Sequence, residues 1–199
     1  MNIAVFVSGN GTNLQAIIAA AKKGHIKSKI ALVVSDNKGA YALKRAEKAG
    51  LKTLVLNPED FGSKEDFDKE IVVNLKKHDI GLVALAGYMR LLTPYFVKEY
   101  RNRILNVHPA LLPSFKGKDG VKDALERGVK VTGPTVHFVT ENIDSGPIVS
   151  QAAVLVKDGD TEESLGERIH KEEYKIYTKA IKDFVEGKLK VVGRKVFNK

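Results

Sequence analysis

The stretch NIAVFVSGNGTNLQAIIAAAKKG, residues 2–24, decides the fold of this chain. Residues 2–8 form a mainly apolar run, which is typical of a buried strand in a parallel sheet. Over residues 13–23 the apolar side chains recur at helical spacing, and Gly24 supplies a stop signal. A strand, a glycine-containing turn and a helix in this order predict the first unit of a parallel α/β sheet.

The same alternation continues to about residue 100. Further strands are predicted at residues 29–35, 52–56 and 80–86, and further helices at residues 40–49, from the cap Ser63 onwards, and at residues 94–100. Residues 80–86, IGLVALA, are apolar throughout, as expected of a central parallel strand. This order predicts a Rossmann-like α/β fold, an open and mostly parallel twisted sheet with helices on both faces.

The rest of the chain has shorter elements. Strands are predicted at residues 104–107, 135–139 and 148–156, helices at residues 119–127 and 161–186, and a small hairpin at residues 189–197 about Gly193. Residues 108–118 are interrupted by proline and are predicted to be a loop. No repeat or linker divides the sequence, so we expect a single domain over residues 1–199, with an N-terminal half to about residue 100 and a C-terminal half beyond it.

The composition excludes several classes of protein. Of the 199 residues, 43% are hydrophobic and 29% are charged, which is too apolar for a disordered chain. There is no Cys, which excludes disulfides, thiolate metal sites, iron–sulfur clusters and a thiol nucleophile. No apolar run approaches the roughly 20 residues of a membrane span, and no signal peptide precedes the first strand. We therefore expect a cytoplasmic protein without membrane contact.

The chain is basic, with 33 Lys and Arg against 24 Asp and Glu and a net charge of +9. Most basic residues are mixed with acidic ones along the predicted helices, and only residues 188–199 are basic with little acidic relief. This distribution favours a solvated surface over a nucleic-acid footprint. Small anionic substrates suit the same charge.

The turn after the first strand, Ser8-Gly9-Asn10-Gly11-Thr12-Asn13, is a candidate phosphate site. A helix N-terminus offers unpaired N–H groups, and glycine lets a phosphate approach the backbone. Two other interpretations stay open. A dinucleotide site would use Asp36 as the ribose-binding acid, but Leu14 stands where the third glycine of that motif belongs. A plain turn capped by the Thr12 or Asn13 side chain also fits.

The segment Asn106-Val107-His108-Pro109 indicates chemistry. Alternate residues of a strand share a face, so Asn106 and His108 point to the same side at its carboxyl end. This amide and imidazole suit either oxyanion stabilisation with proton exchange or plain hydrogen bonding at a strand end. Asp144, in a predicted turn, is the candidate carboxylate, with a simple turn residue as its alternative. Beside His108, its charge would raise the imidazole pKa and favour the protonated form.

The other histidines give weaker signals. His25 and His78 are interpreted as surface residues, and His137 as a packed or supporting residue within its strand. His170 and Glu173 lie three positions apart on the long predicted helix and so share a face. No metal-binding spacing is present, and we predict no metal site.

Four segments together resemble one enzyme family. They are SGNGTNLQAI at residues 8–17, LAGYMRLL at residues 85–92, NVHPALLPSFKG at residues 106–117 and GVKVTGPTVHFVTENIDSGPIVSQ at residues 128–151. With this spacing they resemble the phosphoribosylglycinamide formyltransferase family, folate-dependent enzymes of purine biosynthesis. The resemblance covers nearly the whole chain and implies the formyltransferase form of the α/β fold.

The resemblance implies a role for each matching residue. It makes Asn106, His108 and Asp144 the catalytic trio. The residues implied to bind glycinamide ribonucleotide are Gly11, Thr12, Asn13, His170 and Glu173. Those implied to bind folate are Lys64, Met89, Arg90, Leu91, Leu92, Asn106, Thr140, Glu141, Asn142, Ile143 and Asp144. The N-terminal half would then bind the phosphate, and the C-terminal half would carry the catalytic residues.

The implied reaction transfers a formyl group from 10-formyltetrahydrofolate, a co-substrate, to the amine of glycinamide ribonucleotide. The amine attacks directly, His108 and Asn106 stabilise the oxyanion, and Asp144 assists proton transfer, without a metal. Two departures from the family pattern, Tyr174 and Thr178, bear on substrate closure rather than on the reaction. We expect small-molecule partners, no nucleic acid, and a monomer or weak homodimer.

Three alternatives differ in what they require. Formyltetrahydrofolate deformylase shares the Asn-x-His pattern, but it carries an N-terminal regulatory domain and lacks the SGNGTNL turn, so we expect the transferase. Methionyl-tRNA formyltransferase shares the catalytic core but has a further tRNA-binding domain. A non-catalytic nucleotide-binding module would leave the pattern of Asn106, His108 and Asp144 unexplained.

Overall fold

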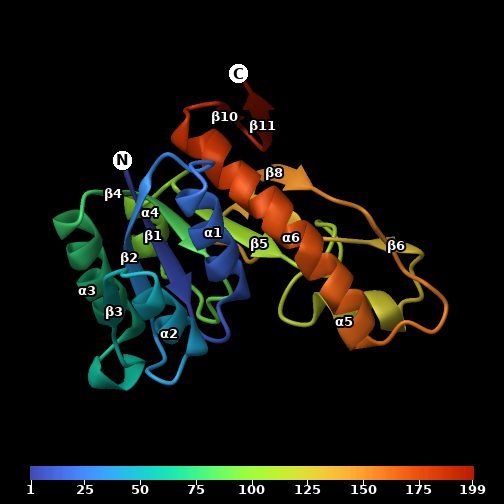
Figure 1. Ribbon diagram of the computed structural model, residues 1–199, viewed down its shortest axis with the longest axis horizontal. Coiled ribbons are helices and arrows are strands. Elements are labelled where there is room, and N and C mark those ends of the chain that lie inside the picture. Colours follow the sequence, from blue (N-terminus) through green and yellow to red (C-terminus); the bar gives the residue numbers. More distant parts are fainter. The chain divides into compact units, whose positions relative to one another are not determined.

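The computed structural model describes residues 1–199 and divides into two compact units, Met1–Leu105 and Asn106–Lys199 (Figure 1). Each unit is described by itself. The helices predicted from the sequence all form, in the predicted order, and the chain is of the α/β class.

The first unit is built on a parallel sheet with the strand order β4-β1-β2-β3. Its strands are β1 (Asn2–Val7), β2 (Lys29–Ser35), β3 (Thr53–Val55) and β4 (Ile80–Leu85). β1 is central, with Phe6 opposite Val34 of β2 and Leu85 of β4. The side chains of residues 3–7 are fully buried, as expected of a central strand covered on both faces.

Helices cover both faces of this sheet. They are α1 (Thr12–Lys22), α2 (Tyr41–Lys48), α3 (Lys64–Lys77) and α4 (Pro94–Glu99), with a short 3-10 helix, η1, at Pro58–Asp60. Because β1, β2 and β3 follow one another in one direction, right-handed crossovers place α1 and α2 on one face. The connection from β3 to β4 returns in the opposite direction, which places α3 on the other face.

The predicted elements of this unit are confirmed to within one or two residues. Ser63 caps α3 as expected, because its Oγ accepts a hydrogen bond from Asp66 N at 3.0 Å. Thr93 caps α4 in the same way by accepting from Phe96 N at 3.4 Å. Such caps satisfy backbone N–H groups that have no partner inside the helix.

The second unit has the strand order β10-β11-β8-β7, followed by residues 106–108 of β5 (Ile104–His108). Its other elements are α5 (Gly120–Glu126), β6 (Val131–Thr132), β7 (Thr135–Phe138), β8 (Ile148–Gln151), β9 (Val154–Leu155), α6 (Glu162–Val185), β10 (Leu189–Val192) and β11 (Lys195–Asn198). The long helix α6 begins at a capping box between Thr161 and Ser164. A small buried cluster of Val154, Leu165 and Ile169 packs α6 against β9.

The strands of this unit differ from the sequence prediction, which also missed β6. Residues 148–156 form two strands, because β8 pairs with β7 whereas β9 pairs with β6 in a separate two-stranded sheet. The change of sheet lies where the chain passes Gly133 so closely that a Cβ there would come within 1.9 Å of Ala152 O. The strand predicted at residues 104–107 also includes His108.

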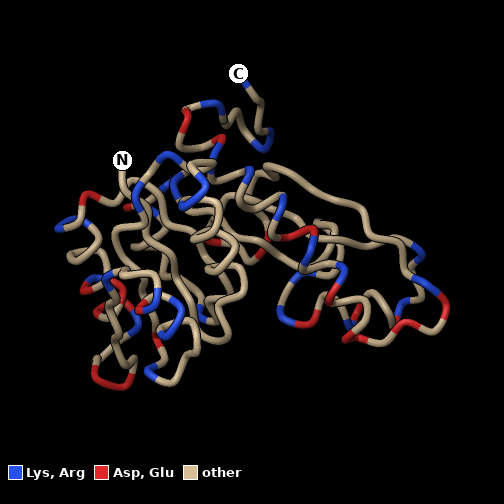
Figure 2. The backbone as a smooth tube through the Cα atoms, viewed as in Figure 1, with Lys and Arg blue, Asp and Glu red and all other residues tan.

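The surface charges follow the predicted distribution. Lys and Arg alternate with Asp and Glu along the helices of each unit, and basic residues surround the C-terminal hairpin (Figure 2). That hairpin forms as predicted, with β10 antiparallel to β11 across Gly193. None of the helices is both long and apolar enough to span a membrane.

Candidate active site

The second unit brings His108 and Asp144 together. His108 ends β5 and is only 4% exposed, and Asp144 lies in the turn between β7 and β8. The imidazole Nδ1 is 3.5 Å from Asp144 Oδ2. In that turn Asp144 has φ 45°, and a Cβ at Gly146 would come within 1.7 Å of the Phe138 carbonyl oxygen. A tight turn that requires glycine therefore aims the carboxylate at the histidine.

His137, on β7, connects Asn106 with Asp144. It is 2% exposed, and its Nδ1 donates to the Phe138 carbonyl oxygen at 2.9 Å. Its Nε2 is 3.3 Å from the Asn106 amide nitrogen and 3.5 Å from Asp144 Oδ1. The structure thus agrees with a supporting role for His137. Its contacts with both other residues were not visible in the sequence, where the only signal was its inward position in a strand.

The loop between β5 and α5 contacts both His108 and Asp144. The Phe115 carbonyl oxygen accepts a hydrogen bond from His108 Nε2 at 2.6 Å. Gly117 N donates to Asp144 Oδ2 at 2.9 Å. In this conformation the loop therefore forms hydrogen bonds with His108 Nε2 and with one carboxylate oxygen of Asp144.

Burial governs the protonation of this pair. Burial lowers the pKa of His108 below its ordinary value and outweighs the Asp144 charge and the Phe115 hydrogen bond, which act in the opposite direction. The expectation that Asp144 keeps His108 protonated is therefore wrong for this conformation. Burial acts to raise the pKa of Asp144, but hydrogen bonds from His137 and Gly117 together with the His108 charge lower it below its ordinary value. At neutral pH the pair is a neutral imidazole beside a carboxylate.

In the first unit, the turn between β1 and α1 presents a helix N-terminus. Gly11 has φ 70° and lies against α2, where a Cβ would come within 2.5 Å of Ala42 Cβ. Only glycine fits both the conformation and the space. No side chain caps α1, so the interpretation of a plain turn with a Thr12 or Asn13 cap is wrong. An uncapped helix N-terminus next to a glycine suits an anion.

Ser8 joins this turn to two neighbouring loops. Its Oγ donates to Asp36 Oδ1 at 2.6 Å and accepts from Met89 N at 2.9 Å. Its N–H donates to Gly87 O at 3.1 Å. Asp36 therefore holds the turn, a different task from the ribose contact of the dinucleotide interpretation. Sequence reasoning missed this role of Ser8, because its partners follow other strands of the parallel sheet.

The predicted folate residues of the first unit lie on two elements. Residues 89–92 belong to the loop between β4 and α4, where Met89 and Leu91 are 62% and 67% exposed. Arg90 places its guanidinium 5.1 Å from the centre of the Phe67 ring. Lys64 is the exposed first residue of α3. Exposed apolar side chains flanking a cation suit a ligand with both apolar and anionic parts.

The predicted folate residues of the second unit form the turn of residues 140–144. Thr140 Oγ1 donates to the Asn142 carbonyl oxygen at 3.2 Å, which closes the turn locally. Ile143 is half exposed, and Glu141 is exposed. The turn thus presents an apolar side chain outward while its last residue, Asp144, faces His108.

His170 and Glu173 are both on α6, but their surroundings differ. Glu173 is buried, whereas His170 is exposed and stacks on Tyr174 with ring centres 6.5 Å apart. Spacing on a helix therefore brought them near one another without giving them the same environment.

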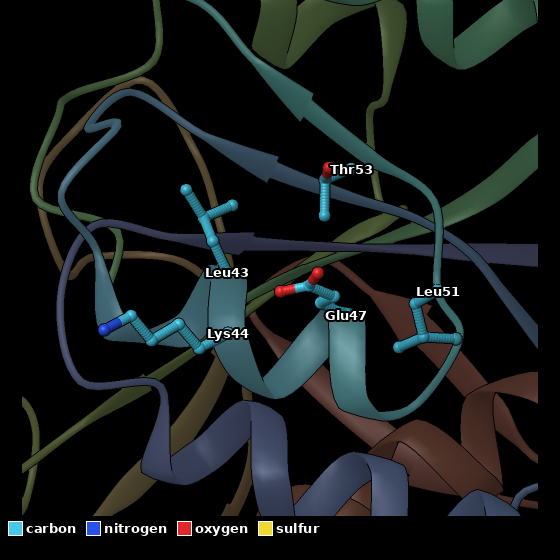
Figure 3. Close-up of a pocket in the computed structure, with 5 residues that line it drawn as sticks. All are labelled: Leu43, Lys44, Glu47, Leu51 and Thr53. Atoms are coloured by element: carbon cyan, nitrogen blue, oxygen red, sulfur yellow. The ribbon is translucent and has the colours of Figure 1, made fainter.

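The surface hollow beside α2 carries none of the predicted site residues. It holds about 320 Å³ and is lined by Leu43, Lys44, Glu47, Leu51 and Thr53 (Figure 3). In Figure 3 the Glu47 carboxylate lies between the two leucine side chains. No group of three or more His, Asp or Glu side chains is placed to hold a metal ion.

Comparison with known proteins decides the family. Residues 1–181 match the formyl transferase family. The chain belongs to the formyl transferase family. The cluster of Asn106, His108 and Asp144 is thus part of a formyl transferase domain.

Two relatives and one solved structure illustrate this formyl transferase membership. Phosphoribosylglycinamide formyltransferase of Escherichia coli (strain K12) is 43% identical over 191 residues, which are 96% of this chain and 90% of that protein. Trifunctional purine biosynthetic protein adenosine-3 of Gallus gallus is 44% identical over 191 residues, but the match spans only 19% of its length. Glycinamide ribonucleotide transformylase 1 from Symbiobacterium toebii has a TM-score of 0.98 and 47% identity, covering 100% of this chain and 93% of that one. The predicted formyltransferase fold is confirmed.

Proposed function

We propose that the protein is a phosphoribosylglycinamide formyltransferase. It transfers the formyl group of 10-formyltetrahydrofolate to the amine of N1-(5-phospho-D-ribosyl)glycinamide and releases tetrahydrofolate, as a step of purine biosynthesis. The observation that carries the proposal is the cluster of buried His108 with partly buried Asp144 and Asn106 within a formyl transferase domain. A relative of this name that matches over 90% of its own length supports the same acceptor.

The reaction begins when the neutral amine attacks the formyl carbon. The pKa of an α-amino group is about 8, so an unprotonated fraction exists at neutral pH. The new C–N bond turns the formyl oxygen into an oxyanion. We assign its stabilisation to His108 Nε2–H and the Asn106 amide. The Phe115 carbonyl oxygen, 2.6 Å from Nε2, marks a place where such an oxygen would lie, so this loop contact is released when substrate binds.

A neutral His108 is sufficient for this role. One ring N–H donates to the formyl oxygen, and the growing negative charge in a buried site raises the imidazole pKa as the transition state forms. The Asp144 carboxylate, 3.5 Å from Nδ1, stabilises the charge that the ring then gains. The attacking amine loses one proton, and the folate nitrogen gains one as its bond to the formyl carbon breaks. Asp144 relays this proton directly or through water.

Substrate binding is assigned to groups outside this cluster. The turn with Gly11, Thr12 and Asn13 binds the phosphate, supported by its uncapped helix N-terminus, and His170 and Glu173 bind the rest of the ribonucleotide. Folate is assigned to Lys64, Met89, Arg90, Leu91, Leu92, Asn106 and the turn from Thr140 through Glu141, Asn142 and Ile143 to Asp144. The enzyme acts on two small molecules in the cytoplasm, as a monomer or weak homodimer, and needs no metal.

The test follows the loss of 10-formyltetrahydrofolate spectroscopically, with and without glycinamide ribonucleotide. Loss that requires the ribonucleotide and yields its formylated product supports the transferase. Loss of the formyl group to water without the ribonucleotide would instead identify a deformylase. No loss in either mixture would contradict a formyl-transfer role.

A further inference from the structure

The loop between β4 and α4 ends beside a buried carboxylate that the proposed reaction does not use. Asp68, on α3, is only 3% exposed. Its Oδ2 accepts two hydrogen bonds from Thr93, one from the backbone N–H and one from Oγ1–H, both at 2.7 Å. Thr93 directly follows Leu92, the last residue assigned to folate. A carboxylate is costly to bury, so these contacts call for an explanation.

Capping of α4 does not explain Asp68. Thr93 Oγ1 already accepts from Phe96 N and so caps the helix by itself. The helix α3 is capped by Ser63 in the same manner, and that cap involves no buried acid. Because the hydroxyl of Thr93 donates to Asp68 while it accepts from Phe96, the carboxylate adds a separate link. That link ties α3 to the end of the loop.

Asp68 also acts on a residue inside the loop. Burial raises the pKa of Asp68, while the Thr93 hydrogen bonds and the charge of Arg90 act against this rise. The Arg90 guanidinium lies over the ring of Phe67, the residue next to Asp68 on α3. Arg90 is the only charged side chain between Gly87 and Leu92. The same short segment of α3 therefore meets this cation with an aromatic face and a negative charge.

We propose that Asp68 is a positioning residue for formyl-folate. It fixes the end of the loop of residues 87–92, so that the loop meets the ligand in one arrangement. The start of the loop is fixed independently by Ser8, which accepts a hydrogen bond from Met89 N. The inference rests on the proposed function, because it takes residues 89–92 as folate contacts. Loss of the carboxylate should weaken folate binding selectively.

The test compares Asp68→Ala, Asp68→Asn and Thr93→Val with wild type in steady-state kinetics for both substrates. Asp68→Ala should raise the KM for formyl-folate about tenfold or more, the effect expected for lost hydrogen bonds to a charged group. Its kcat and its KM for the ribonucleotide should change less than about twofold. Asp68→Asn keeps an acceptor oxygen and should recover most of the loss. Glu70→Ala removes an exposed carboxylate from the same helix and is the control, with constants near wild type.

A parallel rise of both KM values, or a fall in kcat with an unchanged folate KM, would overturn the proposal. If Asp68→Ala does not fold by circular dichroism, Thr93→Val keeps the shape of the side chain and removes the hydroxyl hydrogen bond to Asp68 together with the side-chain cap of α4, while the backbone bond from Thr93 N to Asp68 stays. An unchanged folate KM in that variant would then overturn it. Wild-type protein without turnover would contradict the proposed function and this inference together. Normal wild-type turnover beside an unaffected Asp68→Ala would contradict this inference alone.

Discussion

The turn of residues 8–13 and the cluster around His108 are both assigned to negative charge under the proposed function, but they are built differently. The turn uses backbone groups at an uncapped helix N-terminus and is largely exposed. The cluster uses side chains, of which His108 and His137 are almost fully buried and Asn106 and Asp144 are partly buried. Under the proposed function, the phosphate is charged before it binds, and backbone dipoles in water suffice for it. The oxyanion exists only during the reaction, and it needs donors arranged in advance in a site without water.

The largest effect should come from the cluster. His108→Ala removes the proposed donor to the oxyanion and should lower kcat about a thousandfold. The ribonucleotide KM should stay close to that of wild type, because the turn of the first unit is untouched. Steady-state kinetics with both substrates checks this expectation. A kcat near wild type would show that the oxyanion is held elsewhere.

Asp144→Asn changes the charge of the cluster with little change in shape. The amide oxygen still accepts from Gly117 N, so the loop contact at 2.9 Å can persist. Without the negative charge, a proton on His108 is no longer stabilised, and kcat should fall about a hundredfold. The measurement is kcat, with a thermal melt to show that the fold is retained. A loss confined to KM would contradict the proton-transfer role.

Gly11→Ala tests whether the turn depends on close approach of the backbone. The added methyl group meets both a left-handed φ and Ala42 Cβ at 2.5 Å, and should cost about 3 kcal/mol of unfolding free energy. Gly24→Ala is a matched control, because its φ is 73° but nothing lies within 4 Å of the added atom. It should cost only about 1 kcal/mol. Urea unfolding of both variants gives the comparison, and equal losses would mean that the contact with Ala42 relaxes freely.

Thr12→Val should leave the chemistry alone and weaken the phosphate site. The hydroxyl is a proposed donor beside the helix N-terminus, and its loss should raise the KM for the ribonucleotide about tenfold with kcat unchanged. Kinetics at saturating formyl-folate measures it. If the KM does not move, the phosphate lies elsewhere.

The smallest effect concerns pH. Because burial lowers the pKa of His108 in the folded chain, the unfolded chain binds a proton that the folded one does not once the pH falls below about 6.5. Stability from this group is therefore present above pH 6.5 and is lost on acidification. Asp144 titrates at lower pH and does not contribute in this window. Tm should fall between about pH 7.5 and about pH 5.5, and His108→Asn should reduce that fall by a few degrees. An identical pH dependence in the variant would contradict the lowered pKa.

Local sequence patterns were enough to predict most of the fold. The strands and helices of the first unit follow from short apolar periods, and the cap at Ser63 follows from its spacing to Asp66. The division of residues 148–156 was not predictable, because no glycine, proline or charged residue interrupts them in the sequence and it is the crossing at Gly133 that separates the two strands. A contact with a residue so distant in sequence leaves no local trace.

The candidate site could likewise be predicted only in part from the sequence. Asn106 and His108 share a strand, so their common side was visible, and Asp144 was found as a turn residue before Gly146-Pro147. The links made by His137 and Ser8 depend on neighbouring strands and were not visible. The predicted direction of the His108 pKa shift was also wrong, because the shift depends on how deeply the ring is buried and the sequence does not show that.

The contact between Phe115 and His108 makes the chemical accessibility of this imidazole depend on the loop. In this conformation the imidazole nitrogen is both hidden and hydrogen-bonded, whereas His25 and His170 are exposed. A reagent that acylates imidazole would reach those surface rings at once, and would reach His108 only while the loop is open. The rate at which this one side chain is labelled would therefore report how often the empty enzyme opens, and ligands that open or shut the loop would speed or slow it.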